Sequence, residues 1–287
     1  MKLATLRTGK HGTTAALSLG VDGYLPLPAR DVGQLLNLPD WKALVAEAAA
    51  QGGGSGVVPA HEAELASLLP AAGKVICAGL NYADHIQEMG RELPEYPTLF
   101  AKYADTLIGA ADTIEVYGSG RVDWEAELAV VVGAPLTRAG EDEASRAIAG
   151  YTVANDVSMR DWQNRTLQWF QGKAFDATTP LGPVLATADE FQAGHGFEVR
   201  GYVNGEPVQH GNTGTLVFGP ARLLSYISQF TTLRPGDMVL TGTPGGVGMG
   251  MMPPRFLKDG DILSTEIDGI GRLENRVRIR QGANAAR

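Results

Sequence analysis

Residues Val122–Val132 read VDWEAELAVVV and place two carboxylates directly before an uninterrupted apolar run. A valine-rich run of this length is typical of a buried β-strand. Because side chains alternate across a strand, Glu125 and Glu127 are expected to point to one side and Trp124 to the other. Two carboxylates beside a buried strand carry a cost of desolvation and mutual repulsion. Either they lie on a solvated edge, or a positive group lies between them.

A third acid ends a second strand-like run, Tyr151–Val157, in which Asp156 follows Asn155. No His or Cys lies within a few residues of Glu125, Glu127 or Asp156, so a metal held by these three acids would have oxygen ligands. Oxygen ligands select Mg²⁺, Mn²⁺ or Ca²⁺ over Zn²⁺ or Cu²⁺. Three protein oxygens on an octahedral ion leave positions for water and a chelating substrate. This is the arrangement of a Lewis-acid site that can stabilise an enolate.

From about residue 70 onward the chain alternates apolar runs with turn signals. The runs expected to form strands are 74–80, 107–116, 126–132, 150–154, 197–203, 237–241, 261–267 and 272–279. Turn sequences such as Asn204-Gly205 and Pro235-Gly236 separate them. One helix is predicted over residues 220–229. Many strands with few helices favour an α+β, β-rich domain spanning 71–287.

The first 70 residues predict a small α+β module of their own. Strands are expected over 14–19 and 23–27, and helices over 31–36 and 39–50. The glycine-rich run Gln51–Gly56 contains neither a dinucleotide-binding nor a P-loop pattern, so it predicts a flexible connection. The predicted domains are therefore 1–70 and 71–287.

Composition excludes several classes of protein. The net charge is −8 and there is no basic block, so neither nucleic acid nor an anionic membrane surface is expected as a partner. The single cysteine, Cys77, allows neither an internal disulfide nor a multi-thiolate metal site, and its apolar neighbours indicate a core thiol. No run of 18 apolar residues predicts a spanning helix. We therefore expect a cytoplasmic protein.

Residues Asn81–Gly90 predict a short helix, with Asn81 or Asp84 as its N-cap. His85 and Glu88 lie three residues apart and so share one face. A carboxylate partner orients an imidazole and raises its basicity, and such a pair can deprotonate a water molecule. An exposed pair without function is the alternative.

Two further stretches carry candidate binding residues. Residues 158–176 mix aromatic side chains with cations, which would suit an anionic substrate, although an amphipathic surface segment explains the same pattern. Residues Leu240–Gly248 form a glycine-rich loop directly after a strand, whose N–H groups could hold an oxyanion or could make an ordinary turn.

Together these stretches resemble the fumarylacetoacetate hydrolase superfamily, in its acylpyruvate hydrolase and 2-hydroxyhepta-2,4-diene-1,7-dioate isomerase branch. The resemblance covers about residues 74–278. It rests on five ordered motifs: Gly79-Leu80-Asn81-Tyr82-x-x-His85-x-x-Glu88, Glu125-Ala126-Glu127, Asn155-Asp156-Val157-Ser158-x-Arg160-Asp161, Gly172-Lys173-x-Phe175-Asp176 and Thr241-Gly242-Thr243-Pro244-x-Gly246-Val247-Gly248.

The resemblance implies a rolled mixed β-sandwich, a homodimer, and Mg²⁺ or Mn²⁺ (Ca²⁺ in crystals) bound by Glu125, Glu127 and Asp156. It implies that His85 and Glu88 form a water-activating dyad on a lid. It further implies a substrate-binding set of Arg160, Gln163, Lys173 and Thr243, in which Lys173 also acts in catalysis.

The implied activity is metal-dependent C–C bond hydrolysis of an acylpyruvate-type 1,3-diketo acid of aromatic catabolism, giving pyruvate or a related keto acid and a carboxylic acid. Because the metal-stabilised enolate is the shared element, an oxaloacetate decarboxylase or a dienedioate isomerase remains an alternative. A non-catalytic binding module that keeps the fold is a further one. The expected partner is a small oxo acid.

Overall fold

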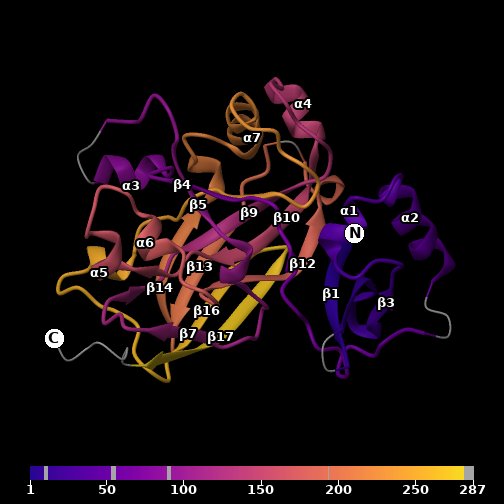
Figure 1. The fold of residues 1–287 in the computed structure, drawn as a ribbon, viewed down its shortest axis with the longest axis horizontal. Helices are drawn as coiled ribbons and strands as arrows, with labels where there is room; N and C mark the ends of the chain where they lie inside the picture. The colour runs from indigo at the N-terminus through magenta and orange to yellow at the C-terminus, as the bar shows by residue number, and fades with distance from the viewer. Residues whose placement is uncertain (10–11, 53–55, 89–91, 193, 281–287) are drawn as a thin grey trace.

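The structure, a computed structural model, describes residues 1–9, 12–52, 56–88, 92–192 and 194–280, without the side chains of residues 85, 87 and 88. Within these residues the strands form three sheets (Figure 1). The strands are β1 Lys2–Thr8, β2 Gly12–Ser18, β3 Tyr24–Pro26, β4 Val75–Gly79, β5 Thr98–Lys102, β6 Leu107–Ile108, β7 Ile114–Tyr117, β8 Val122–Asp123, β9 Ala126–Val132, β10 Ile148–Asn155, β11 Ser158–Met159, β12 Thr179–Thr187, β13 Glu198–Val203, β14 Glu206–Asn212, β15 Met238–Leu240, β16 Ile262–Ile267 and β17 Gly271–Arg280.

The helices are short. The α-helices are α1 Val32–Leu36, α2 Trp41–Gln51, α3 Ala83–Glu88, α4 Glu141–Arg146, α5 Arg160–Gln163, α6 Phe170–Lys173 and α7 Pro220–Ser228, and the 3₁₀ turns are η1 Gly20–Asp22, η2 Ala104–Thr106, η3 Ala188–Glu190, η4 Thr213–Thr215 and η5 Gly248–Gly250. Within the described ranges, none of the helices has the length and apolar character needed to cross a bilayer.

The largest sheet runs in the order β3-β2-β1-β12-β10-β9-β15-β4-β5, with β6 added beside β12. Every residue of β9 is buried, as its valine-rich sequence predicts for a strand covered on both faces. Strand β10 pairs antiparallel to β9, and β15 pairs antiparallel to its other edge. The amino end of β9 therefore lies beside the carboxyl ends of β10 and β15.

A second sheet, in the order β14-β13-β16-β17-β7, packs against this centre. Apolar side chains of β9, such as Leu128, meet those of the second sheet, such as Val199 and Leu273, in one buried cluster. Figure 1 shows the strands of the second sheet running across the lower part of the molecule, beside the central strands. The expected β-rich, rolled mixed sandwich is confirmed.

The first 70 residues contribute strands to the large sheet. Strand β1 pairs antiparallel to both β2 and β12, so the chain's beginning extends the sheet that holds β9. Helices α1 and α2 cover it, burying Leu35, Trp41 and Val45. Because both parts of the chain contribute strands to one sheet, the boundary between two domains at residue 70 stays a prediction. Residues 53–55 of the expected connection lie outside the described residues.

Several strands lie outside the runs expected from the sequence, among them β1, β5, β12 and β14. Strand β12 reads TPLGPVLAT, and its prolines and glycine interrupt the apolar pattern, yet it lies between β1 and β10. Strands β5 and β14 are likewise additional, with burial patterns that do not alternate regularly. The run expected over 107–116 is two strands, because a turn closed by the bond from Asp112 N–H to the Gly109 carbonyl breaks it.

Candidate active site

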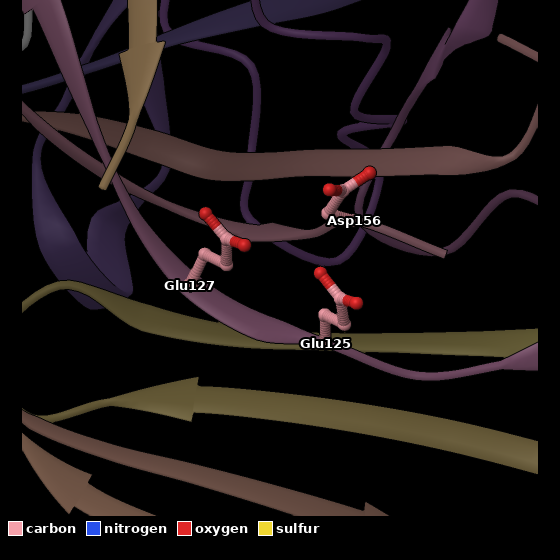
Figure 2. A group of neighbouring side chains, drawn as sticks. All are labelled: Glu125, Glu127 and Asp156. Atoms are coloured by element: carbon pink, nitrogen blue, oxygen red, sulfur yellow. The ribbon is translucent and has the colours of Figure 1, made fainter. Parts of the chain in front are cut away.

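The three acids singled out from the sequence meet in the structure. One carboxylate oxygen from each of Glu125, Glu127 and Asp156 lies within 4.8 Å of the others, and all three residues are buried. Figure 2 shows Glu125 and Glu127 projecting from the same stretch of chain toward the side on which Asp156 lies. The solvated-edge alternative is therefore wrong for these acids.

Strand pairing explains the convergence. Glu127 is opposite Ala154, and Ala126 is opposite Asn155, in the antiparallel register of β9 and β10. The amide oxygen of Asn155 accepts a hydrogen bond from Glu125 N–H, and Asp156 N–H donates to the Glu125 carbonyl. These bonds place the third acid directly beside the first.

Two buried lysines neutralise the acids. Lys173 Nζ, at the end of α6, lies 2.8 Å from Oε2 of Glu125 and 2.7 Å from Oδ2 of Asp156. Lys102 Nζ, at the end of β5, lies 2.5 Å from Oδ1 of Asp156. The positive group that the sequence required between the carboxylates is thus supplied in part by the chain itself.

The lysines also set the protonation of the acids. Burial alone would raise the pKa of Asp156, but the charges and hydrogen bonds of Lys102 and Lys173 outweigh it and bring that pKa to about 2. Burial likewise acts to lower the pKa of Lys173, and the carboxylates of Asp156 and Glu125 reverse this and raise it. Both partners of this pair are therefore charged at neutral pH.

Glu127 is in a different situation. Burial raises its pKa well above the ordinary value, and the nearby charges of Asp156 and Glu125 add to the effect. Its Oε2 accepts a bond of 2.8 Å from Gly242 N–H, in the glycine-rich loop after β15. Gly242 has φ +99°, and a Cβ there would lie 2.9 Å from the Ala78 carbonyl oxygen, so the loop approaches the acid only with glycine at this position.

Arg160 lies beside the same acids. Its Nη1 is 2.7 Å from Glu125 Oε1 and 2.8 Å from the amide oxygen of Gln163, and its Nε is 2.8 Å from Oδ2 of Asp123. Asp123 is fully buried and accepts backbone bonds from Gly248 and Met249 as well. The predicted substrate-binding arginine is therefore held at the site, and its Gln163 neighbour with it.

Thr243 is held by the fold. Its hydroxyl donates to the Ala126 carbonyl and accepts from the side-chain amide of Gln209. The hydroxyl proton is thus already used on the start of β9, and a direct bond from it to substrate stays a prediction.

Of the expected dyad, the structure describes the backbone. His85 and Glu88 lie three residues apart in α3, as predicted, and their side chains lie outside the described part of the molecule. The expected capping by Asn81 or Asp84 is wrong, because α3 begins at Ala83. Instead the Asn81 side chain donates to the carbonyls of Phe218 and Thr241 and accepts from Phe218 N–H.

Sequence reasoning missed Lys102 and Asp123. Lys102 ends the apolar run TLFAK, and a lysine in such a run indicates a buried cation. Because a buried cation needs an acid nearby, this pattern could have predicted a carboxylate partner for Lys102. Asp123 lies within the stretch that carries Glu125, and its role appears only when Arg160 and the glycine-rich loop are brought to it.

The donor set fits a hard divalent cation. Two oxygens bound at about 2.1–2.4 Å to one ion can be separated by at most about 4.2–4.8 Å, which agrees with the spacing of the three acids. With Glu125, Glu127 and Asp156 supplying only oxygen, the site could hold a metal of the Mg²⁺, Mn²⁺ or Ca²⁺ type.

A rolled β fold with a buried acidic triad that could hold a divalent metal, and with cations beside it, has the makings of an enzyme active site. The family described as fumarylacetoacetate (FAA) hydrolase C-terminal matches residues 74–278. The chain belongs to this family, which confirms the resemblance seen in its motifs.

Three similar proteins show the range of activities around it. Oxaloacetate tautomerase Fahd2a, mitochondrial, of Rattus norvegicus is 47% identical over 206 residues, which are 71% of this chain and 66% of the relative. A fumarylacetoacetate hydrolase from psychrophilic Exiguobacterium antarcticum has a TM-score of 0.82 at 31% identity, covering 98% of this chain and 100% of that one. The 5-carboxymethyl-2-hydroxymuconate delta-isomerase from Mycobacterium smegmatis has a TM-score of 0.79 at 31% identity, with the same coverage.

Proposed function

We propose that this protein is a divalent-metal-dependent enzyme that forms and protonates the enolate of a small 2-oxo diacid, and that its reaction is the keto–enol tautomerisation of oxaloacetate. The observation that carries the proposal is the buried triad with Lys173 bonded to two of its acids. The sequence relative of highest identity described above is named an oxaloacetate tautomerase. That likeness favours tautomerisation over the C–C hydrolysis first expected.

The reaction moves one proton between C3 of the substrate and the oxygen on C2, with no other bond made or broken. The reaction passes through an enolate intermediate of high energy, in which negative charge develops on the C2 oxygen. Glu125, Glu127 and Asp156 would hold a Mg²⁺ or Mn²⁺ ion, which when bound supplies Lewis-acid stabilisation of that charge.

Cationic side chains of the protein would also stabilise the enolate and bind the substrate. The Lys173 ammonium, held at the acids, is positioned to stabilise the same developing charge, and burial strengthens its effect. Arg160, oriented by Asp123 and Gln163, would bind a substrate carboxylate. His85, supported by Glu88, would carry the proton to or from C3.

The test is the rate at which enol-oxaloacetate converts to the keto form, followed by its ultraviolet absorbance. We expect acceleration by the native protein with Mg²⁺ or Mn²⁺, loss of acceleration with EDTA, and a loss of at least 100-fold in Asp156→Asn. The matched control is Asp161→Asn, which alters an acid bonded to Ser119. An undiminished rate in EDTA would contradict the proposal.

Hydrolysis of an acylpyruvate is the second candidate. The structural likeness to a fumarylacetoacetate hydrolase and the His85–Glu88 spacing favour it, since hydrolysis adds an activated water to the same enolate chemistry. Release of pyruvate from a panel of acylpyruvates and oxaloacetate distinguishes the candidates. Cleavage of an acylpyruvate that requires His85 supports hydrolysis, turnover of oxaloacetate to pyruvate indicates a decarboxylase, and a fast tautomerisation without pyruvate supports the first proposal. A dienedioate isomerase would act on neither.

We further propose that the protein acts as a homodimer in the cytoplasm. Light scattering measures the oligomeric state, and microscopy of a tagged chain in its native cell measures the location. The relative described above is mitochondrial by name, so localisation is worth measuring directly.

A further inference from the structure

The residue between the two glutamates, Ala126, is held on one side by side chains in place of a strand. The pairing of β15 with β9 ends where Leu240 is opposite Ala129. Further toward the start of β9, the side chain of Gln209 accepts a bond of 2.9 Å from Ala126 N–H, and the Thr243 hydroxyl donates a bond of 3.0 Å to the Ala126 carbonyl. Two side chains therefore replace the strand ladder at the point where the acids begin.

The amide of Gln209 joins this segment to the glycine-rich loop. Its oxygen accepts from Ala126, and its nitrogen donates to Oγ1 of Thr243 at 2.8 Å and to the Pro244 carbonyl at 3.0 Å. The amide oxygen and both amide hydrogens are thus bonded. Because these bonds fix which way the amide points, Gln209 holds the start of β9 and the loop in one arrangement.

The second sheet is built to deliver this side chain. Gln209 is 3% exposed, whereas the other residues of β14 are exposed or half-buried. It is opposite Gly201, and the register between β13 and β14 shifts directly after this pair, as in a bulge that redirects a side chain. A Cβ at Gly201 would lie 3.2 Å from Oε1 of Gln209 and 3.6 Å from Cβ of Ala126, so glycine leaves the amide room to reach Ala126.

The backbone that Gln209 holds carries two acids of the triad. Ala126 lies between Glu125 and Glu127, so a displacement of its peptide groups would redirect both carboxylates. Side chains that orient the ligands of a metal are part of the metal site, although they do not touch the ion.

We propose that Gln209 is a positioning residue of this site, which sets the separation of the Glu125 and Glu127 carboxylates for a divalent cation by holding Ala126. The inference rests on the proposed function, in which the three acids bind the ion. It adds a residue of the second sheet to the requirements for metal binding.

The experiment measures the affinity of the metal-free protein for Mn²⁺ by calorimetry. Gln209→Met keeps the length of the side chain and removes its three bonds. We expect it to bind Mn²⁺ about 10- to 100-fold more weakly than the native protein. Thr243→Val removes the other bond to Ala126 and should also weaken Mn²⁺ binding, so it decides the question if Gln209→Met does not fold.

Asn275→Leu is the matched control. The Asn275 amide is 1% exposed and donates to the carbonyls of Gly109 and Asp112, in the turn between β6 and β7. Its loss also removes a buried amide, so it should lower the Tm of the metal-free protein as Gln209→Met does. It should leave the affinity for Mn²⁺ unchanged.

Each result has one meaning. If the native protein binds Mn²⁺ and folded Gln209→Met binds it equally well, the inference fails and the proposed function stands. If Gln209→Met and Asn275→Leu lose Mn²⁺ affinity to the same extent, the loss reflects a general weakening of the fold, and the inference is overturned. If the native protein does not bind Mn²⁺, both the inference and the proposed function fail.

Discussion

Lys173 Nζ lies 2.7 Å from Oδ2 of Asp156, and both side chains are almost completely buried. Lys173 ends a short helix, whereas Asp156 follows the end of a strand. The same ammonium also bonds Glu125, so one lysine joins two acids of the triad. The positive charge of Lys173 offsets the repulsion between these two carboxylates and so allows both to be buried.

Replacing this lysine should destabilise the metal-free protein. Lys173→Met leaves buried carboxylates without their partner, at an expected cost of about 3–5 kcal/mol. Added Mg²⁺ should raise the Tm of the variant more than that of the native protein, because a divalent cation supplies the missing charge. Thermal unfolding with EDTA and with Mg²⁺ measures both effects.

Lys74→Met is the control for this comparison. Lys74 is partly exposed and lies 3.3 Å from Asp237, so its loss should cost no more than about 1 kcal/mol and should not alter the response to Mg²⁺. Equal Tm gains from Mg²⁺ in native protein and Lys173→Met would contradict the expectation.

Metal binding should release a proton from Glu127. Since its pKa is raised, part of this acid is protonated in mildly acidic solution and must ionise to bind a cation. Calorimetric titrations with Mn²⁺ at about pH 5.5, in two buffers of different ionisation enthalpy, count the protons released. Glu127→Gln should release fewer and bind more weakly, whereas equal proton release by the variant would place the protonated group elsewhere.

Acid should remove the stabilisation that Asp156 provides. Its folded-state pKa of about 2 lies below the ordinary value of 3.8, so the carboxylate stabilises the fold fully above about pH 4 and progressively less as the pH falls toward 2. The free energy of unfolding of the metal-free native protein relative to Asp156→Asn should therefore shrink by about 2 kcal/mol across this interval. Urea unfolding at a series of pH values measures it, and a difference independent of pH would contradict the assignment.

The buried amide of Asn81 should matter more than an exposed one that makes similar bonds. Asn81→Ala removes two donated bonds and one accepted bond inside the protein, at an expected cost of about 3 kcal/mol or more. Asn37, which is exposed, also donates to two carbonyls, those of Gly33 and Pro235. Urea unfolding should show a loss of about 1 kcal/mol or less for Asn37→Ala, and comparable losses would show that burial of the amide is unimportant.

The β-rich fold and the three clustered acids could be predicted from the sequence, because both follow from patterns among neighbouring residues. The alternation of side chains placed Glu125 and Glu127 on one side of a strand, and the structure brings their carboxylates together with that of Asp156. The strand predicted over 126–132 has these bounds in the structure, and the helix predicted over 220–229 is one residue shorter. Periodicity is a property of neighbouring residues, so it survives without knowledge of the rest of the chain.

The contacts that complete the site were decided by tertiary structure. Lys102 reaches Asp156 across 54 residues of sequence, and Asn81 reaches Thr241 across 160. Strand β12 forms despite its prolines because β1 and β10 lie on its two sides. A local pattern can indicate that a buried charge requires a partner. Which residue is that partner depends on strand pairing and packing, because these bring distant segments together.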